Sequence, residues 1–424
     1  MTTDNPILIV GAGISGLCLG QALLRSQIPF HIYERDAIFN RRAQGYRVRI
    51  TSVGIAALTA CLPPELVSRV KACCAPITKA LEETWNLDGV SGEEIVGPQL
   101  GLQGWQTQKR TESRGKSMDP GGQTPQMNEY VEQLNADRTV LRGLLMRGLE
   151  AYVTFGKEFE EFETTAGGVK VRFADGSGIE GALLVGADGA GSRIRRQLVP
   201  EFEIVDTEGR FLYGKTLITP ELEERMDYRA LEGMSVIQDR TKDLVLTLFL
   251  EPMRFKDNKF RSELPEDYVY WLLAAHKDRY EMDDARLLRL SGEEPANLTQ
   301  ELTCGWHSSF QALFDLQNAA QTSMIRIVSA RPDIPAWDST KNVTLIGDAA
   351  HVMPPSAGVG ATTALRDAAT LSQAFAEEGS QVKKVEKYEG LMRAYAREVL
   401  VRSASGGKHM FDMRPFEELK PVPV

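Results

Sequence analysis

The apolar positions at the start of the chain predict a strand, a tight turn, a helix and a second strand. Residues 7–10 (ILIV) are a short apolar run, which is typical of a buried strand. The turn GAGISG at 11–16 follows, and residues 17–26 carry apolar side chains at helical spacing. A second apolar run at 28–33 ends at Glu34. This order predicts a βαβ unit with two parallel strands.

The glycines of that turn have the spacing GxGxxG, which binds dinucleotides when a strand precedes it and a helix follows. Gly11 permits the bend, Gly13 lets a pyrophosphate approach the backbone, and Gly16 lets the helix pack closely on the strand. The helix N-terminus attracts phosphates. Glu34 would accept hydrogen bonds from a ribose and repel a 2′-phosphate, so the ligand expected here is FAD or NAD.

Two later segments repeat the pattern of a strand followed by a turn of small residues. Residues 182–198 (ALLVGADGAGSRIRRQL) predict a strand at 183–185, and residues 343–351 (VTLIGDAAH) predict another that ends at Asp348. Ligands of parallel sheets bind beyond the carboxyl ends of the strands. We therefore expect Asp348 to lie beside Gly11 in space.

The rest of the chain gives weaker signals. Residues 138–150 predict a helix and 151–187 predict short strands, with a turn at Asp175-Gly176. From 200 to 330 strand-like runs such as 243–250 alternate with helix-like ones such as 268–280, which indicates an α+β substrate region. The polar segment 106–126 is interpreted as a surface loop, with an active-site flap as the alternative.

Composition limits the function classes. The net charge of −9, without a Lys/Arg-rich block, argues against a nucleic-acid partner. No apolar run approaches the roughly 20 residues of a membrane span, and the N-terminus does not resemble a signal peptide. The five cysteines are odd in number and lack metal-site spacing. These features predict a cytoplasmic protein without a metal that acts on a small molecule, and they leave a monomer and a homodimer both open.

Together the three turn motifs resemble those of the single-component FAD-dependent monooxygenases, which include para-hydroxybenzoate hydroxylase and the tetracycline-inactivating enzymes. The resemblance implies a Rossmann-like α/β FAD-binding domain of the para-hydroxybenzoate hydroxylase type. A smaller α+β substrate domain interleaves with it, and helices end the chain. The expected FAD-binding domain comprises 1–78, 130–200 and 335–405, the substrate domain 79–129 and 201–334, and the C-terminal tail 406–424.

The resemblance also implies cofactor contacts. Asp188 and Gly189, with Ser192 and Arg195, should lie near the pyrophosphate, Asp348 near the ribityl chain, and Arg138 near the flavin. A helix N-terminus after Pro354 and Pro355 would aim N–H groups at the anionic reduced ring. The motif departs from the family at Val359 and Thr362. The complete set of expected cofactor contacts is Gly11, Gly13, Ser15, Gly16, Glu34, Arg35, Arg138, Asp188, Gly189, Gly347, Asp348, Pro355, Gly358, Gly360 and Ala361.

Catalytic and substrate residues are less defined. Arg47 and Arg49 share one face of a predicted strand, where they either form a solvated edge or contact flavin or substrate. With Pro354 they are the candidate catalytic residues. His351 fits a packing role better than that of a general base. Tyr213, Phe249 and Trp271 are candidates for an apolar substrate wall, with a core role as the alternative.

The function that the resemblance implies is a FAD-dependent monooxygenase. NADPH or NADH would reduce FAD, dioxygen would form a flavin 4a-hydroperoxide, and one oxygen atom would enter a small aromatic or secondary-metabolite substrate. Hydroxylation, epoxidation and Baeyer–Villiger insertion are all open. The alternatives are a FAD-dependent reductase or dehydrogenase that transfers no oxygen, and a FAD-binding regulator without turnover.

Overall fold

The structure contains a five-stranded parallel sheet whose strands come from widely separated parts of the chain. It is a computed structural model that describes residues 5–39, 47–77, 84–95 and 133–422, so the predicted loop at 106–126 lies outside the described residues. The sheet consists, in spatial order, of β16 (Val343–Leu345), β10 (Leu183–Gly186), β1 (Ile7–Val10), β2 (Phe30–Glu34) and β6 (Val153–Phe155). All neighbouring pairs are parallel. The three predicted turn motifs therefore leave adjacent strands at the same edge.

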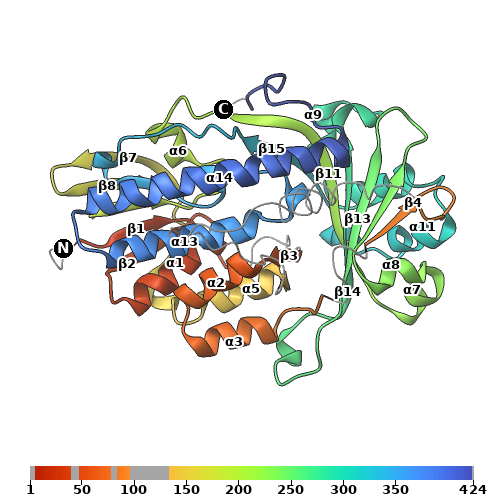
Figure 1. Ribbon diagram of the computed structural model, residues 1–424, viewed down its shortest axis with the longest axis horizontal. Helices are drawn as coiled ribbons and strands as arrows, with labels where there is room; N and C mark the ends of the chain where they lie inside the picture. Colours follow the sequence, from red (N-terminus) through yellow and green to blue (C-terminus); the bar gives the residue numbers. More distant parts are fainter. Residues whose placement is uncertain (1–4, 40–46, 78–83, 96–132, 423–424) are drawn as a thin grey trace, which may run out of the picture.

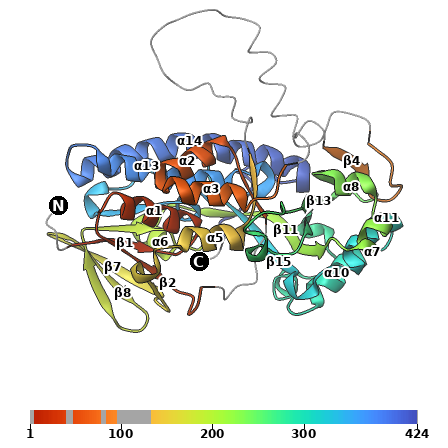
Figure 2. The same cartoon turned by 90° about the horizontal axis from the view of Figure 1, so that it is seen from below.

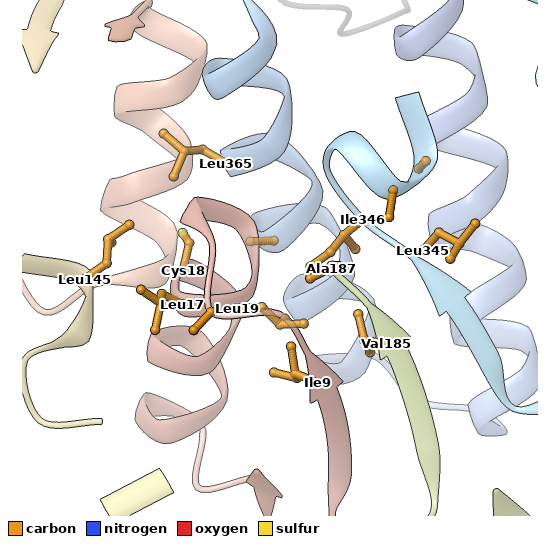
Figure 3. Packing of buried hydrophobic residues seen from close by; sticks show 14 of the residues in the cluster. Ile9, Leu17, Cys18, Leu19, Leu145, Val185, Ala187, Leu345, Ile346 and Leu365 are labelled. Carbon is orange, nitrogen blue, oxygen red and sulfur yellow. The ribbon is translucent and has the colours of Figure 1, made fainter. Parts of the chain in front are cut away.

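Helices pack on this sheet through apolar side chains. Figure 3 shows Ile9, Val185 and Leu345 of the sheet gathered with side chains of α1 and α13. The helices of this region are α1 (Ile14–Arg25), α2 (Ser52–Cys61), α3 (Pro64–Ala72), α5 (Arg138–Met146), α6 (Arg193–Leu198), α12 (Asp348–His351), α13 (Gly360–Ala376) and α14 (Gln381–Phe411). The predicted first helix is confirmed, although it begins three residues earlier, directly after the turn.

A second, six-stranded sheet lies toward the other end of the molecule (Figures 1 and 2). Its pairs are antiparallel except for β4 with β12. The spatial order is β15 (Ser323–Ala330), β11 (Ile204–Leu217), β14 (Tyr268–His276), β13 (Leu246–Met253), β12 (Ser235–Asp239) and β4 (Trp85–Asp88). The helices of this part of the chain are α7 (Pro220–Arg225), α8 (Tyr228–Glu232), α9 (Asp284–Leu287), α10 (Glu294–Leu302) and α11 (Ser308–Asp315).

The helix-like segment 268–280 is a strand, so that prediction was wrong. β14 covers Tyr268–His276 and is followed by a 3-10 turn at Lys277–Arg279. All nine residues of β14 are buried, with the even positions 268–274 in one core cluster and the odd positions 269–275 in another. A strand buried on both faces has no polar alternation, so its sequence cannot be told from that of a buried helix.

Smaller elements complete the fold. β3 (Arg47–Ile50) pairs with β5 (Leu134–Asp137), and β7 (Phe159–Thr165), β8 (Gly168–Phe173) and β9 (Gly178–Gly181) form an antiparallel sheet. The other 3-10 turns are η3 (Glu150–Tyr152), η4 (Arg261–Glu263), η6 (Ala319–Gln321), η7 (Ser339–Lys341) and η8 (Pro355–Ala357). The α/β architecture predicted from the sequence is confirmed.

Helix α14 runs along the long axis from beside the parallel sheet toward the six-stranded sheet in Figures 1 and 2. It continues without a break from Gln381 to Phe411, so the expected boundary between 405 and 406 falls inside it. The domain boundaries stay predictions. In the described ranges, no helix is long and apolar enough to cross a membrane.

Candidate active site

A cavity of about 230 Å³ opens where β1, β2 and β10 end. Gly11, Gly13, Glu34, Arg35 and Asp188 are all in its wall, although they come from three separate turns. The parallel register explains this arrangement, because Val10 pairs with both Tyr33 and Gly186. The expected meeting of the first two motifs is therefore observed.

The buried carboxylate of Glu34 organises this first cavity. It accepts hydrogen bonds from the backbone N–H groups of Ala12 at 2.8 Å and Asp36 at 3.0 Å. Arg142 lies 3.8 Å from the same carboxylate and donates to the Ala12 carbonyl at 2.7 Å. Sequence reasoning missed Arg142, although it follows Arg138 by one helical turn and both side chains line the cavity. The Glu34 carboxylate thus has a cation beside it.

Two glycines of the turn are required by close packing. A Cβ on Gly11 would lie 2.2 Å from the Ala187 carbonyl oxygen, and φ at this residue is +111°. A Cβ on Gly16 would lie 2.1 Å from the Gly11 carbonyl oxygen. Around Gly13, in contrast, nothing lies within 4 Å of an added Cβ, so this position faces open space in the cavity. Close packing thus requires glycine at positions 11 and 16, whereas the approach of a pyrophosphate to Gly13 stays a prediction.

A second cavity of about 340 Å³ continues from the first, and the two share Gly13, Arg138, Ala187 and Gly189. Ser15 and the exposed carboxylate of Asp348 line it. So do the expected residues at the start of α13 and the preceding turn, Pro354, Pro355, Gly358, Gly360 and Ala361. Gly358 has φ of +64°. The third motif thus joins the other two, and a helix N-terminus borders the cavity.

Arg195 ties the second turn to the third. Its guanidinium donates to the Ala190 carbonyl at 2.7 Å and to the Ala349 carbonyl at 3.0 Å. Burial lowers its pKa to about 10, so it remains a cation at neutral pH. Ser192 caps helix α6 by accepting from the Arg195 N–H. Arg195 thus links the two turns, and neither it nor Ser192 is among the described residues that line the cavities.

A buried network supports the Gly347-Asp348 turn from behind. Asp367 accepts from the Gly347 N–H at 2.6 Å and from the Tyr395 hydroxyl at 2.5 Å, and His351 Nε2 lies 2.6 Å from the same carboxylate. Burial alone would lower the pKa of His351, but the Asp367 carboxylate raises it on balance. His351 is therefore placed in a supporting network. Gly347 adopts φ of +62°, and a Cβ there would meet Ser15 Oγ at 2.7 Å.

Arg47 and Arg49 line the second cavity, but they do not form a solvated edge. Both guanidiniums pair with Glu251, a buried residue of β13. The Arg49 distance is 3.2 Å. Burial and the neighbouring Arg47 lower the pKa of Arg49 to about 10. Glu251 was missed because a single acid at the end of an apolar run carries no motif.

The three candidate wall residues separate in the structure. Phe249 lines the second cavity, together with Tyr270 and Leu272 of the neighbouring strand. Tyr213 is buried with its ring 6.4 Å from that of Tyr270, and it is not among the described lining residues. Trp271 lies in the core cluster on the other face of the sheet, where its indole N–H donates to Thr216. Only Phe249 of the three reaches the cavity within the described part of the chain.

Comparison with known proteins agrees with this geometry. A match to the FAD binding domain family covers residues 4–234 and 307–403, which is more than half of the chain. The chain belongs to this FAD binding domain family. Membership of this family supports FAD as the cofactor, which the three turn motifs predicted.

Curated relatives in this family are named as FAD-dependent monooxygenases. The dual O-methyltransferase/FAD-dependent monooxygenase elcB of Phaeosphaeria nodorum is 37% identical over 98% of this chain and 47% of its own length. The chain thus spans about half the length of the first curated relatives that it matches. The 6-hydroxynicotinate 3-monooxygenase of Pseudomonas fluorescens is 25% identical over 90% of this chain and 85% of its own length.

Solved structures show the same fold. A putative FAD-containing monooxygenase from Photorhabdus luminescens aligns with a TM-score of 0.76 and 27% identity, covering 96% of this chain and 99% of that one. Salicylate hydroxylase in a substrate complex aligns with a TM-score of 0.67 at 16% identity over 99% of this chain and 92% of its own, which speaks for the fold alone.

The residues present fit FAD. The joined cavities form one elongated crevice, as a dinucleotide requires. Added Cβ atoms at Gly13 and Gly189 would meet nothing within 4 Å, so the backbone is open to a ligand there. Asp188 Oδ1 is buried and, within the described ranges, has no hydrogen-bond partner, while Oδ2 accepts from the Arg193 N–H at 2.9 Å. Asp188 and the open backbone at Gly13 and Gly189 line the same crevice.

Proposed function

We propose that the chain is a FAD-dependent, NAD(P)H-consuming monooxygenase that inserts one oxygen atom of dioxygen into a small organic substrate. The observation that carries the proposal is the crevice that runs from Glu34 through Gly13 to the aromatic wall at Phe249 and Tyr270. A dinucleotide site that ends against an aromatic wall suits a flavin enzyme with an aromatic or secondary-metabolite substrate. The names of the relatives support the same reaction class.

The first cavity would hold the adenosine and pyrophosphate part of FAD. Glu34 would accept from the ribose, because its carboxylate is already oriented by two backbone N–H groups. Arg35, Asp188, Gly189 and Arg142 would surround the sugar and phosphates. Gly11 and Gly16 would act through the shape of the turn. Gly13 and the N-terminus of α1 would face the pyrophosphate.

The second cavity would hold the flavin ring and the substrate. When bound, FAD supplies the redox and oxygen chemistry. Asp348 and Ser15 would bind the ribityl chain, and Arg138 would contact the flavin. The N–H groups at the start of α13, around Gly358, Gly360 and Ala361, would stabilise negative charge on the ring. Pro354 and Pro355 fix the approach of the chain to these groups.

Arg47, Arg49 and Phe249 would contribute to the substrate side of the cavity, where apolar and aromatic side chains exclude water. The arginines could donate hydrogen bonds to a substrate oxygen, whereas Phe249 and Tyr270 would pack on an aromatic ring. No residue is assigned a proton-transfer role. NADPH and NADH are both open as the reductant, and the cytoplasmic location and the monomeric or homodimeric state stay predictions.

The test is a coupled assay on the FAD-loaded protein. Aromatic compounds are screened for those that accelerate NAD(P)H oxidation, and dioxygen uptake and product mass are measured for each. A monooxygenase consumes dioxygen and gives a product heavier by one oxygen atom. Flavin reduction without oxygen transfer to any compound would favour the reductase or dehydrogenase, and protein that takes up no flavin would overturn the proposal.

A further inference from the structure

Glu251 joins the two arginines of the second cavity into one buried cluster. Its Oε2 pairs with Arg47 and lies 3.2 Å from Arg49 Nη2. Its Oε1 accepts from Asn135 Nδ2 at 2.6 Å and from Arg49 Nη2 at 3.2 Å. Asn135 Oδ1 in turn accepts from Arg47 Nε at 3.2 Å. Both carboxylate oxygens are thus saturated by donors from β3 and β5.

The cluster is oriented with its cations toward the cavity and its anion behind them. Arg47 and Arg49 line the cavity, whereas Glu251 is 3% exposed and is not among the described lining residues. Glu251 sits opposite Tyr270 in the β13–β14 register, two residues from Phe249. Arg49 Nε is buried and, in the described part of the chain, has no hydrogen-bond partner. Because Arg49 also lines the cavity, its guanidinium is the group that can donate to a ligand oxygen there.

The carboxylate changes what the two arginines can bind. Without it, two adjacent guanidiniums on an apolar wall would form a strong receptor for a substrate carboxylate. Glu251 already occupies that position and halves the formal charge of the pair. Burial alone would raise the pKa of Glu251, but Arg47, Arg49 and the Asn135 amide lower it on balance, so it is an anion at neutral pH. A buried ion pair often adds little to the free energy of unfolding. We therefore consider the effect of Glu251 on which ligands the cavity binds.

We propose that Glu251 is a specificity-determining residue that makes the cavity favour an uncharged aromatic substrate with a hydrogen-bond acceptor over an aromatic carboxylate. This inference rests on the proposed function, because it concerns the substrate of the same site. An uncharged carbonyl or hydroxyl oxygen can accept from Arg49 without displacing Glu251. A substrate carboxylate would instead compete with Glu251 for the donors and be repelled by it.

The experiment compares 2-naphthamide with 2-naphthoate, two probes of the same shape that differ in charge. Their dissociation constants are measured on the FAD-loaded protein by calorimetry and by perturbation of the flavin spectrum. The wild type should bind the amide more tightly. Glu251→Gln keeps the shape but removes the charge, and at a separation of a few ångström it should shift the preference toward the carboxylate by about tenfold or more.

Two further variants separate charge from structure. Arg49→Gln/Glu251→Gln removes one charge of each sign and should return the preference toward that of the wild type. Asp239→Asn neutralises another buried acid of the same sheet, one that pairs with Arg279, and should leave the preference unchanged. A general structural defect would weaken both probes alike and would not alter their ratio.

The outcomes distinguish this inference from the proposed function. A wild-type protein that prefers 2-naphthoate overturns the inference even if Glu251→Gln does not fold, and so does an unchanged ratio in a folded Glu251→Gln protein. Either result can occur in a protein that binds FAD and consumes dioxygen. Failure to bind FAD would instead remove the proposed function itself.

Discussion

The two sheets build their halves of the crevice by different means. The parallel sheet contributes turns, where open backbone at Gly13 and Gly189 lines the cavity together with polar side chains such as those of Glu34 and Arg142. The antiparallel sheet contributes side chains, and its wall consists of Phe249, Tyr270 and Leu272 with Glu251 behind. Backbone geometry restricts the residue type at each position, whereas a side-chain wall accepts many substitutions. The first half can therefore be recognised in a sequence and the second half cannot.

The largest expected effect tests the backbone half. Gly11→Ala would place a Cβ 2.2 Å from the Ala187 carbonyl oxygen at a residue with positive φ, so it should cost about 4 kcal/mol or more of unfolding free energy. Denaturant unfolding of the apoprotein measures this. Gly13→Ala is the matched control, because its Cβ meets open space. It should keep the stability of the apoprotein and weaken FAD binding about tenfold or more. Equal stability of the two variants would contradict the assigned roles.

The network behind the third turn should give a smaller effect that depends on pH. Asp367→Asn leaves His351 without its carboxylate and should cost about 3 kcal/mol at pH 6. Because Asp367 raises the pKa of His351 in the folded state, the stabilisation is complete below the ordinary histidine pKa of about 6.5. It is lost as pH rises through the folded-state pKa.

Unfolding free energies of wild type and Asp367→Asn between pH 5 and 9, a range chosen around the ~6.5 reference value, should therefore converge as pH rises. Asp175→Asn, which affects an exposed pair with Lys157, serves as the control and should change stability by less than about 1 kcal/mol. A difference that grows with pH would contradict the assignment of His351.

Arg195 tests whether the turns must be held together. Arg195→Met removes two hydrogen bonds that join Ala190 to Ala349 and should cost about 2 kcal/mol. Since the lost bonds link two turns of the crevice, FAD affinity should fall together with stability. Thermal unfolding and a flavin titration measure the two quantities. Arg196→Met, at a half-buried position of the same helix, removes a longer hydrogen bond of 3.4 Å to the Gly191 carbonyl and should lower both quantities far less. Unchanged affinity in Arg195→Met would show that the turns need no such link.

The smallest effects test the side-chain half. Phe249→Leu and Trp271→Phe change neighbouring strands of one sheet, and each should cost about 1 kcal/mol of stability. Only Phe249→Leu should change the binding of aromatic probes to the FAD-loaded protein, since Trp271 packs on the far face. Calorimetric titration with 2-naphthamide distinguishes them. An equal loss of probe binding in both would mean that the cavity depends on sheet packing in general.

The turns of the parallel sheet could be predicted from the sequence, whereas the side-chain wall of the antiparallel sheet could not. The βαβ start could be predicted because an apolar run, three glycines and an acid must occur at fixed spacing. The meeting of the first and third turns at adjoining cavities followed from parallel strands ending at one edge. β14 was assigned wrongly because both of its faces are buried. Glu251 was missed because its ion pairs depend on contact between β13 and β3, and neither periodicity nor spacing in the sequence predicts that contact.

Helix α14 connects the region of the parallel sheet to the wall of the second cavity. Its 31 residues extend for about 46 Å at ~1.5 Å per residue, from Gln381, which donates to the Ala182 carbonyl, to Met410 in the wall of the second cavity. Two tyrosines fix its position along the way: the Tyr388 hydroxyl donates to the Leu345 carbonyl, and the Tyr395 hydroxyl donates to Asp367. Inserting one residue after Tyr395 would slide and rotate everything beyond by about 1.5 Å and 100°. Met410 would then turn out of the cavity. An insertion far from the crevice would therefore change the shape of the cavity wall.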